Sequence, residues 1–221
     1  MSGGKAFAVG DVHGCLEMLK RLIDKIEWNP SNDRLIFIGD YIDRGEDAKG
    51  VVDFILKLKE DSPLVECLIG NHEQMFLDYL SGVNSQNFLL NGGTSTLRSY
   101  KEVRQSEKDP LIPSSHLDFF SSLLPMIEFE QYYIVHAGFR PDIRIEDQDP
   151  FDMIWIRDEF IYADYDFGKV VIFGHTPFNR PMVMKNKIGI DTGAVYGNCL
   201  TCLELSEERK FHSVEPKSFD S

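Results

Sequence analysis

The chain has 221 residues, of which 43% are hydrophobic and 27% are charged, and its formal net charge is −13. This length and apolar content suffice for one large core, so we expect a single domain over residues 1–221. The acidity argues against nucleic-acid binding, which needs a basic surface. No run reaches the roughly 18–20 apolar residues of a membrane span, and the first residues lack signal-peptide features, so we expect a cytoplasmic protein with no membrane partner.

The first seventy residues alternate between strand and helix patterns. Apolar runs predict strands at Ala6–Val9, Arg34–Ile38 and Leu64–Ile69. Helical spacing of apolar residues predicts helices at Cys15–Ile26 and Ala48–Lys59. A strand–helix–strand–helix–strand order is typical of a parallel sheet, whose ligands lie beyond the carboxyl ends of the strands.

The rest of the chain changes character near its middle. Residues 72–125 are predicted to be mostly helical. From Met126 the sequence is rich in strands, with a hairpin formed by MIEFE and YYIVH, followed by KVVIFG, MVM, KIGID and LTCLEL. The stretch around Phe151–Ile161 is predicted to be helical. The second half therefore adds a largely β-structured layer.

Five short glycine-containing blocks carry the chemistry. They are GDVHG at 10–14, GDYIDRG at 39–45, GNHE at 70–73, HAG at 136–138 and GHT at 174–176. Each directly follows a predicted strand and contains a residue able to bind a metal. One such block alone would be weak evidence, but five indicate loops that converge on one metal centre.

The residue types in these blocks favour a transition metal. Asp11 and His13 are two positions apart after one strand, and Asp40 holds the equivalent place after the next. A carboxylate together with an imidazole suits Mn, Fe or Zn better than Ca or Mg. The remaining candidate ligands are Asn71, His136 and His175.

Asp43 and Arg44 allow two interpretations. They could form an ordinary ion pair on the surface. The bracketing glycines, Gly39 and Gly45, favour a specialised loop instead. An arginine beside a metal site matches the planar, bidentate geometry that phosphate oxygens prefer.

Three other motifs are weaker. Cys15 and Arg21 have the C-x5-R spacing of cysteine phosphatases, but the residues between them favour a helix rather than a phosphate loop. Asp191 begins a D-T-G-A sequence, which aspartic proteases need in two copies. Cys199 and Cys202 form a C-x-x-C within a predicted strand, where a redox pair is not expected.

The five blocks together resemble the metal-dependent phosphoprotein phosphatase family, within the calcineurin-like metallophosphoesterases. The similarity is greatest to the small bacterial and phage branch that contains the phage lambda phosphatase. It extends over about residues 5–205 and includes LLNGG at 89–93, Trp155–Arg157, IFGHTP at 172–177 and IDTGAV at 190–195. The resemblance implies one metallophosphoesterase catalytic domain with an α/β (α+β) fold, a two-sheet β sandwich flanked by helices.

The resemblance also implies a role for each site residue. Two divalent metal ions are expected, Mn first, with Fe or Zn as alternatives. Asp40 would bridge them, His72 would face the leaving group with Asp43 orienting it, and the phosphate oxygens would bind Arg44 and Arg157. The other ligands would be Asp11 and His13 for one metal, and Asn71, His136 and His175 for the second.

The implied reaction is hydrolysis of a phosphoester by a metal-bridging hydroxide. We expect a serine/threonine protein phosphatase, with dual specificity left open, whose partner is a phosphorylated protein or a small phosphoester. The alternative is a symmetrical diadenosine-tetraphosphate hydrolase, because the same core supports both activities. Glu73 favours the protein phosphatase, since the tetraphosphatases typically carry aspartate there, and residues 74–135 are expected to shape the substrate mouth.

Overall fold

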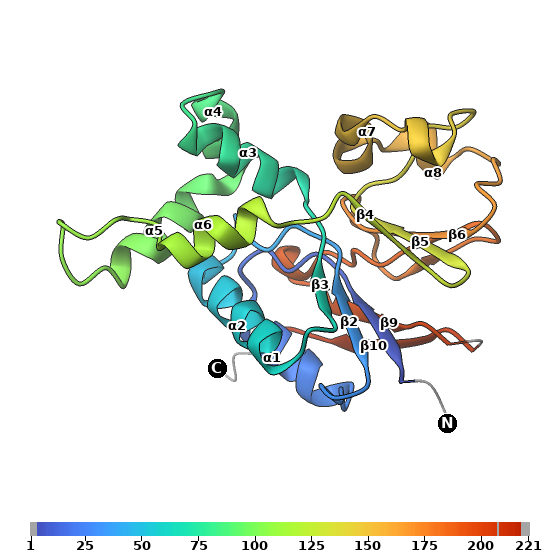
Figure 1. The fold of residues 1–221 in the computed structure, drawn as a ribbon, viewed down its shortest axis with the longest axis horizontal. Helices are drawn as coiled ribbons and strands as arrows, with labels where there is room; N and C mark the ends of the chain where they lie inside the picture. Colours follow the sequence, from blue (N-terminus) through green and yellow to red (C-terminus); the bar gives the residue numbers. More distant parts are fainter. Residues whose placement is uncertain (1–3, 207, 218–221) are drawn as a thin grey trace.

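The computed structural model describes residues 4–206 and 208–217 of the chain. Two five-stranded mixed sheets pack face to face with helices on their outer sides (Figure 1), which confirms the predicted sandwich. The order in the first sheet is β10 (Lys210–Val214), β9 (Leu200–Glu204), β1 (Ala6–Val9), β2 (Arg34–Phe37) and β3 (Val65–Cys67). The order in the second is β4 (Met126–Phe129), β5 (Tyr132–Val135), β6 (Val170–Phe173), β8 (Lys187–Gly189) and β7 (Met182–Val183).

Strand direction follows the sequence prediction. The strands β1, β2 and β3 are parallel, with Ala6 opposite Arg34 and Leu35 opposite Val65. The strands β4 and β5 form the expected antiparallel hairpin, and β5, β6 and β8 run parallel to one another. The carboxyl ends of parallel strands therefore meet at a common edge in each sheet.

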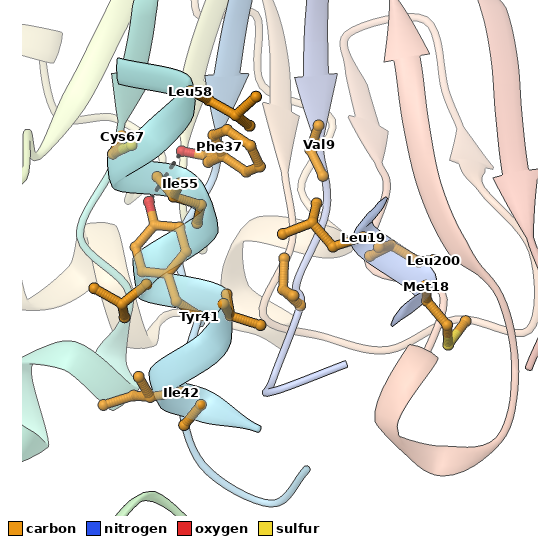
Figure 2. Close-up of a cluster of buried hydrophobic side chains, with 14 of the residues drawn as sticks. Val9, Met18, Leu19, Phe37, Tyr41, Ile42, Ile55, Leu58, Cys67 and Leu200 are labelled. Atoms are coloured by element: carbon orange, nitrogen blue, oxygen red, sulfur yellow. Dashed lines mark hydrogen bonds between the residues drawn. The ribbon is translucent and has the colours of Figure 1, made fainter. Parts of the chain in front are cut away.

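Two helices cover the outer face of the first sheet, namely α1 (Leu16–Lys25) and α2 (Ala48–Asp61). Alternate residues of each strand point to opposite faces. Figure 2 shows Val9 and Phe37 from the strands beside Leu19, Ile55 and Leu58 from the two helices. The apolar stripe of each helix is thus buried against one face of the sheet.

The other face of the first sheet packs against the second sheet. Ala8 and Ile36 from the first sheet share a buried cluster with Ile134, Ile172 and Ile188 from the second. Central strands are therefore apolar on both faces, which is why their sequences read as continuous hydrophobic runs.

The segment predicted to be mostly helical forms an arm beside the sandwich, drawn in green in Figure 1. This arm consists of α3 (Asn71–Leu80), α4 (Ser85–Phe88), the π-helical turn η1 (Leu89–Gly93), α5 (Thr94–Glu102) and α6 (Ser114–Ser121). The prediction of helix there is confirmed. No helix within the described residues has the length and apolar character needed to cross a membrane.

The stretch predicted to be helical around Phe151–Ile161 forms two short helices, α7 (Pro150–Trp155) and α8 (Asp158–Ile161). Arg157 breaks the run because its backbone angles, φ −132° and ψ −100°, are not helical. The remaining turns are the short 3-10 helices η2 (Ile145–Asp147) and η3 (Ala194–Tyr196). A single domain over 1–221 stays a prediction, and residues 1–3, 207 and 218–221 lie outside the described residues.

Candidate metal centre

The predicted metal ligands come together from both sheets. Asp11, Asp40 and Asn71 follow β1, β2 and β3, while His136 and His175 follow β5 and β6. All five are buried. These residues meet because the parallel strands of each sheet end at a common edge. For example, the His175 backbone N–H donates to Asp11 Oδ2 at 3.0 Å, although the two residues are 164 positions apart.

Asp40 lies at the centre of the cluster. Its Oδ2 is 3.4 Å from His13 Nε2, and its Oδ1 is 3.4 Å from His136 Nε2. Two groups able to hold a metal share this carboxylate, one formed with His13 and His72 and the other with His136 and His175. A single carboxylate with a different imidazole at each oxygen has the arrangement needed to bridge two cations.

Backbone carbonyls fix the orientation of two of these imidazoles. His13 Nδ1 is 2.8 Å from the carbonyl oxygen of Ile42, and His136 Nδ1 is 2.9 Å from that of Ile38. Since a carbonyl only accepts, Nδ1 carries the proton in both rings and Nε2 keeps its lone pair. Both Nε2 atoms lie 3.4 Å from an Asp40 oxygen, and a free lone pair there is what a metal ligand requires.

Asn71 belongs to the second group. Its Oδ1 lies 3.0 Å from His136 Nε2 and 2.8 Å from His175 Nδ1. Asn71 is the first residue of α3, which begins shortly after the end of β3, and its amide oxygen lies among the histidines. The structure thus brings together the four side chains predicted to bind the second metal, namely Asp40, Asn71, His136 and His175.

The first group contains His72, which was not predicted to be a metal ligand. The structure places His72 close to His13 and Asp40, with rings of His13 and His72 only 4.7 Å apart between centroids. Asp11 contacts the loop of the second group, where its Oδ2 accepts from the His175 backbone N–H. Geometry alone therefore admits either Asp11 or His72 beside His13 and Asp40, and the assignment of Asp11 stays a prediction.

Burial and mutual charge set the protonation of the centre. Burial lowers the pKa of His13 to about 3 and that of His175 to about 2, so both rings are neutral at physiological pH. Burial would raise the pKa of Asp40, but the adjacent histidines, His136 foremost, hold it below the ordinary value. Neutral imidazoles around an ionised carboxylate are the protonation states that metal binding needs.

Two buried polar atoms in this region lack a hydrogen-bond partner among the described residues. They are Asp11 Oδ1 and His175 Nε2, which belong to neighbouring side chains. Buried polar atoms without a partner are rare in folded proteins. A carboxylate oxygen and an imidazole nitrogen would both be satisfied by a divalent transition metal, so the donor set fits such an ion.

Strained backbone also concentrates here. Positive φ angles, which side-chain-bearing residues seldom adopt, occur at His13 (44°), Asp40 (52°) and His175 (63°). The adjacent loop adds Asp43 (71°) and Arg44 (69°). Each such residue costs about 1–3 kcal/mol, so the surrounding structure must hold these loops in place.

His72 and Asp43 form a buried pair next to the cluster. His72 Nδ1 lies 2.6 Å from Asp43 Oδ2, and the exposed fractions are 1% and 0%. Burial raises the pKa of Asp43, whereas the contact with His72 opposes that rise. Because Asp43 occupies Nδ1, only Nε2 of His72 remains for a ligand or substrate.

The two predicted phosphate-binding arginines occupy different surroundings. Arg44 Nη1 is 2.6 Å from His13 Nε2, and the guanidinium lies 5.7 Å from the ring of Tyr196. Arg157 donates to Thr176 Oγ1 at 3.2 Å, next to His175 in the chain. Arg44 thus adjoins the first group and Arg157 the second.

The family model for calcineurin-like phosphoesterases matches residues 4–198 of this chain. The chain belongs to that family. A curated relative, serine/threonine-protein phosphatase 1 of Salmonella typhimurium, is 33% identical over 209 residues, covering 90% of this chain and 91% of the relative. Another, the asymmetrical bis(5'-nucleosyl)-tetraphosphatase PrpE of Bacillus anthracis, is 24% identical and covers 90% and 89%.

Solved structures agree on the fold of this phosphoesterase. A crystal structure described as a candidate diadenosine tetraphosphatase superposes with a TM-score of 0.75 at 20% identity, covering 98% of this chain and 96% of that one. At this identity the match supports the fold alone. The expected calcineurin-like sandwich is therefore confirmed, while the substrate is not decided by these comparisons.

The weaker motifs have structural explanations in this phosphoesterase. Cys15 directly precedes α1, and burial raises the pKa of its thiol to about 11, which disfavours the thiolate of a cysteine phosphatase. Asp191 accepts a hydrogen bond from the Gly193 backbone N–H at 2.9 Å and stabilises a turn. Cys202 is buried within β9, as expected for a core residue.

Two residues near the site have roles that the sequence reasoning did not anticipate. Glu73 is fully buried and accepts hydrogen bonds from the backbone N–H groups of Asp40, Tyr41 and Gly70 at 2.8–3.0 Å. It therefore supports the Asp40 loop and has no contact with solvent. Thr96 contacts Asp43 from the helical arm, 53 residues away. The one signal in the sequence that could have pointed to Thr96 is the LLNGG motif, which lies just before it in the chain.

Proposed function

We propose that this chain is a dinuclear-metal-dependent phosphomonoesterase that removes phosphate from serine or threonine residues of proteins. The observation that carries the proposal is the carboxylate of Asp40 placed between His13 and His136. Family membership supports phosphoester hydrolysis, and the 33% identity to a serine/threonine phosphatase supports the substrate class.

The metals are proposed to be Mn, with Fe or Zn as alternatives. Asp11, His13 and Asp40 would hold one ion, and the second would be held by the remaining ligands, Asp40, Asn71, His136 and His175. Two such ions supply positive charge for the phosphoryl oxygens and an attacking water of lowered pKa.

The chain's own side chains would perform the other tasks. Arg44 and Arg157, approaching from opposite groups, would bind phosphoryl oxygens with their planar guanidinium forks. His72 would donate the proton that the departing alkoxide needs, with Asp43 holding its ring through Nδ1. The buried position of this pair excludes water from the proton donor.

The remaining parts of the proposal concern partners and location. A phosphorylated protein is the proposed partner, in the cytoplasm, with neither nucleic acid nor membrane as a ligand. The net charge of −13 supports the absence of nucleic-acid and membrane ligands, because a strongly acidic surface repels polyanions. The positive charge for a single phosphate would come locally from the metals and the two arginines.

A second candidate function is cleavage of a dinucleoside tetraphosphate. It is favoured by the similarity to the PrpE tetraphosphatase over 90% of this chain. Glu73 is compatible with both functions, because its side chain accepts hydrogen bonds from backbone N–H groups inside the loop.

Competing substrates would test the proposal directly. The metal-stripped protein is reloaded with Mn, Fe or Zn and assayed on phosphoserine, phosphothreonine and phosphotyrosine peptides and on diadenosine tetraphosphate. A kcat/KM at least about tenfold higher on phosphoserine or phosphothreonine peptides is expected. The reverse preference would establish the tetraphosphatase instead, and activity that survives EDTA would contradict both.

A further inference from the structure

Thr96 makes two hydrogen bonds to one residue of the proposed proton-donating pair. Its Oγ1 accepts from the Asp43 backbone N–H at 2.9 Å and donates to Asp43 Oδ1 at 2.6 Å. The other carboxylate oxygen, Oδ2, is the one beside His72 Nδ1 at 2.6 Å. Each oxygen of the carboxylate thus has its own partner, and together they fix the plane of the group.

This chain of contacts is sealed from solvent. The exposed fractions of Thr96 and Asp43 are both 0%, and that of His72 is 1%. A hydrogen bond to a buried charged group has about twice the strength of one between neutral groups. No water can replace the hydroxyl of Thr96 without a rearrangement, so its loss would leave Asp43 Oδ1 unpaired.

The segment that carries Thr96 supports the neighbouring arginine as well. Gly92 O accepts from the Arg44 backbone N–H at 3.3 Å and from the Ser95 hydroxyl at 2.9 Å. A side chain at Gly92 would approach Arg44 Cγ within 2.8 Å, and its φ of 105° also requires glycine. Residues 92–96 therefore support the strained turn formed by Asp43 and Arg44.

We infer that Thr96 is a positioning residue for proton donation to the leaving group. It acts through Asp43, whose carboxylate it orients so that His72 keeps its ring plane and directs Nε2 toward the departing oxygen. The inference rests on the proposed function, in which His72 is the proton donor. It assigns the helical arm a part in the chemical step, beyond shaping the substrate mouth.

The test compares poor and good leaving groups in the Mn-loaded protein. Thr96→Val keeps the shape of the side chain and removes the hydroxyl. It is expected to lower kcat on phenyl phosphate by about 10–100-fold and on p-nitrophenyl phosphate by less than about threefold, with KM unchanged. Thr96→Ser should restore most of the loss. Thr94→Val is the matched control, because Thr94 is exposed on the same helix.

A spectroscopic measurement complements the kinetics. In Zn-loaded protein, which is diamagnetic, the short contact between His72 and Asp43 should give a far-downfield proton resonance, assigned by its absence in His72→Asn. It is expected to shift or broaden in Thr96→Val and to persist in Thr96→Ser and Thr94→Val. Should Thr96→Val fail to fold, Thr96→Cys, with a weak donor of similar size, takes its place with a smaller loss.

The outcomes separate this inference from the proposed function. His72→Asn should slow phenyl phosphate by about 10²–10⁴-fold and p-nitrophenyl phosphate less. If it slows both equally, the role of His72 in the proposed function is wrong. If His72→Asn behaves as expected but Thr96→Val slows both substrates equally, or neither, only the inference about Thr96 is overturned. The double variant with Thr96→Val and His72→Asn should show the same difference in kcat between the two substrates as His72→Asn alone.

Discussion

Asp40 has three structural features that matter for the candidate metal centre. Its carboxylate faces a histidine at each oxygen, its backbone adopts a left-handed conformation, and its N–H is held by Glu73. Substitutions at this residue therefore report on both metal groups at once.

Replacement of Asp40 by asparagine should disrupt both metals. The amide has the same shape but lacks the negative charge between the two groups. We expect metal content to fall from about two ions toward zero and kcat/KM to fall by more than about 100-fold. Elemental analysis and phosphatase assays would measure these effects. Asp142→Asn is the control, because Asp142 also has a positive φ but is exposed. Full metal content in Asp40→Asn would refute the bridging role.

Glu73 offers a second prediction for a single residue. In Glu73→Asp the side chain is one methylene shorter. Its carboxylate therefore cannot accept hydrogen bonds from all three backbone N–H groups that donate to Glu73. We expect a loss of about 1–3 kcal/mol in stability and weaker metal binding. The preference between phosphopeptide and diadenosine tetraphosphate should stay unchanged within about twofold. A reversed preference would show that this residue selects the substrate after all.

His116 provides a pH-dependent prediction away from the metal cluster. Its Nδ1 lies 2.7 Å from the Tyr100 hydroxyl and its Nε2 3.0 Å from Asp53 Oδ1. Burial lowers the pKa of His116, partly opposed by Asp53. Its stabilising effect is therefore complete above about pH 6.5, the value for unfolded chains, and is lost as pH falls, because the unfolded chain then binds the proton more readily.

Urea unfolding of chelator-treated protein would measure this effect. The free energy of unfolding should differ more between wild type and His116→Asn at pH 7.5 than at pH 5.5. Both proteins share the other titrating groups, so their contributions cancel in the comparison. An equal difference at the two pH values would exclude a lowered pKa of His116 in the folded state.

At the level of elements, the short helix α8 determines where Arg157 lies. Lys187 of β8 is fully buried and donates to the backbone carbonyls of Phe160 at 2.5 Å, Ile161 at 3.5 Å and Ala163 at 2.7 Å. A lysine ammonium there donates hydrogen bonds to the unpaired carbonyl oxygens at the carboxyl end of the helix, and its positive charge is attracted by the helix dipole. The helix begins directly after Arg157, so its anchor also fixes that arginine.

Lys187→Met should therefore weaken both stability and phosphate binding. The methionine fills the space but leaves buried carbonyls unpaired, which costs about 2–4 kcal/mol. Less restraint on Arg157 should raise KM severalfold with a smaller change in kcat. Lys185→Met, at an exposed position next to the same strand, should change neither value. Thermal unfolding and steady-state kinetics would provide the comparison.

The sequence predicted those elements whose periodicity is simple. Ala6–Val9 is a strand as expected, and the helical and hairpin segments also occur where predicted. The stretch around Phe151–Ile161 is helical as expected, but its division into two helices at Arg157 was not predicted, because apolar spacing carries no information on the backbone of that residue. The contact of Thr96 with Asp43 joins residues 53 positions apart, and no local pattern in the sequence encodes such a contact.

At the level of the whole molecule, the candidate metal ligands come from both sheets. Asp11 and Asp40 belong to loops of the first sheet, and His136 and His175 to loops of the second. Ligands held in place only by folding contribute their binding energy to stability. The motifs predicted this convergence because each ends a strand, whereas the packing of the two sheets was implied only by the family resemblance.

Mn should therefore stabilise the folded chain. At a concentration 100 times Kd, one bound ion adds about 2.7 kcal/mol, which corresponds to a rise in Tm of roughly 5–10 °C for a chain of this size. Thermal unfolding with Mn and with EDTA would measure the shift. Asp40→Asn should show little of it. An equal shift in that variant would indicate that Mn binds elsewhere.

The position of β1 has a consequence for synthesis of the protein. This strand lies between β2 and β9, and Phe7 pairs with Glu204. On the ribosome, one edge of β1 thus stays open until residues 200–204 have been made. An open strand edge can pair with other chains, and pairing over such a long separation is slow. Nascent chains of this phosphoesterase would therefore depend on chaperones more than its compact final fold suggests.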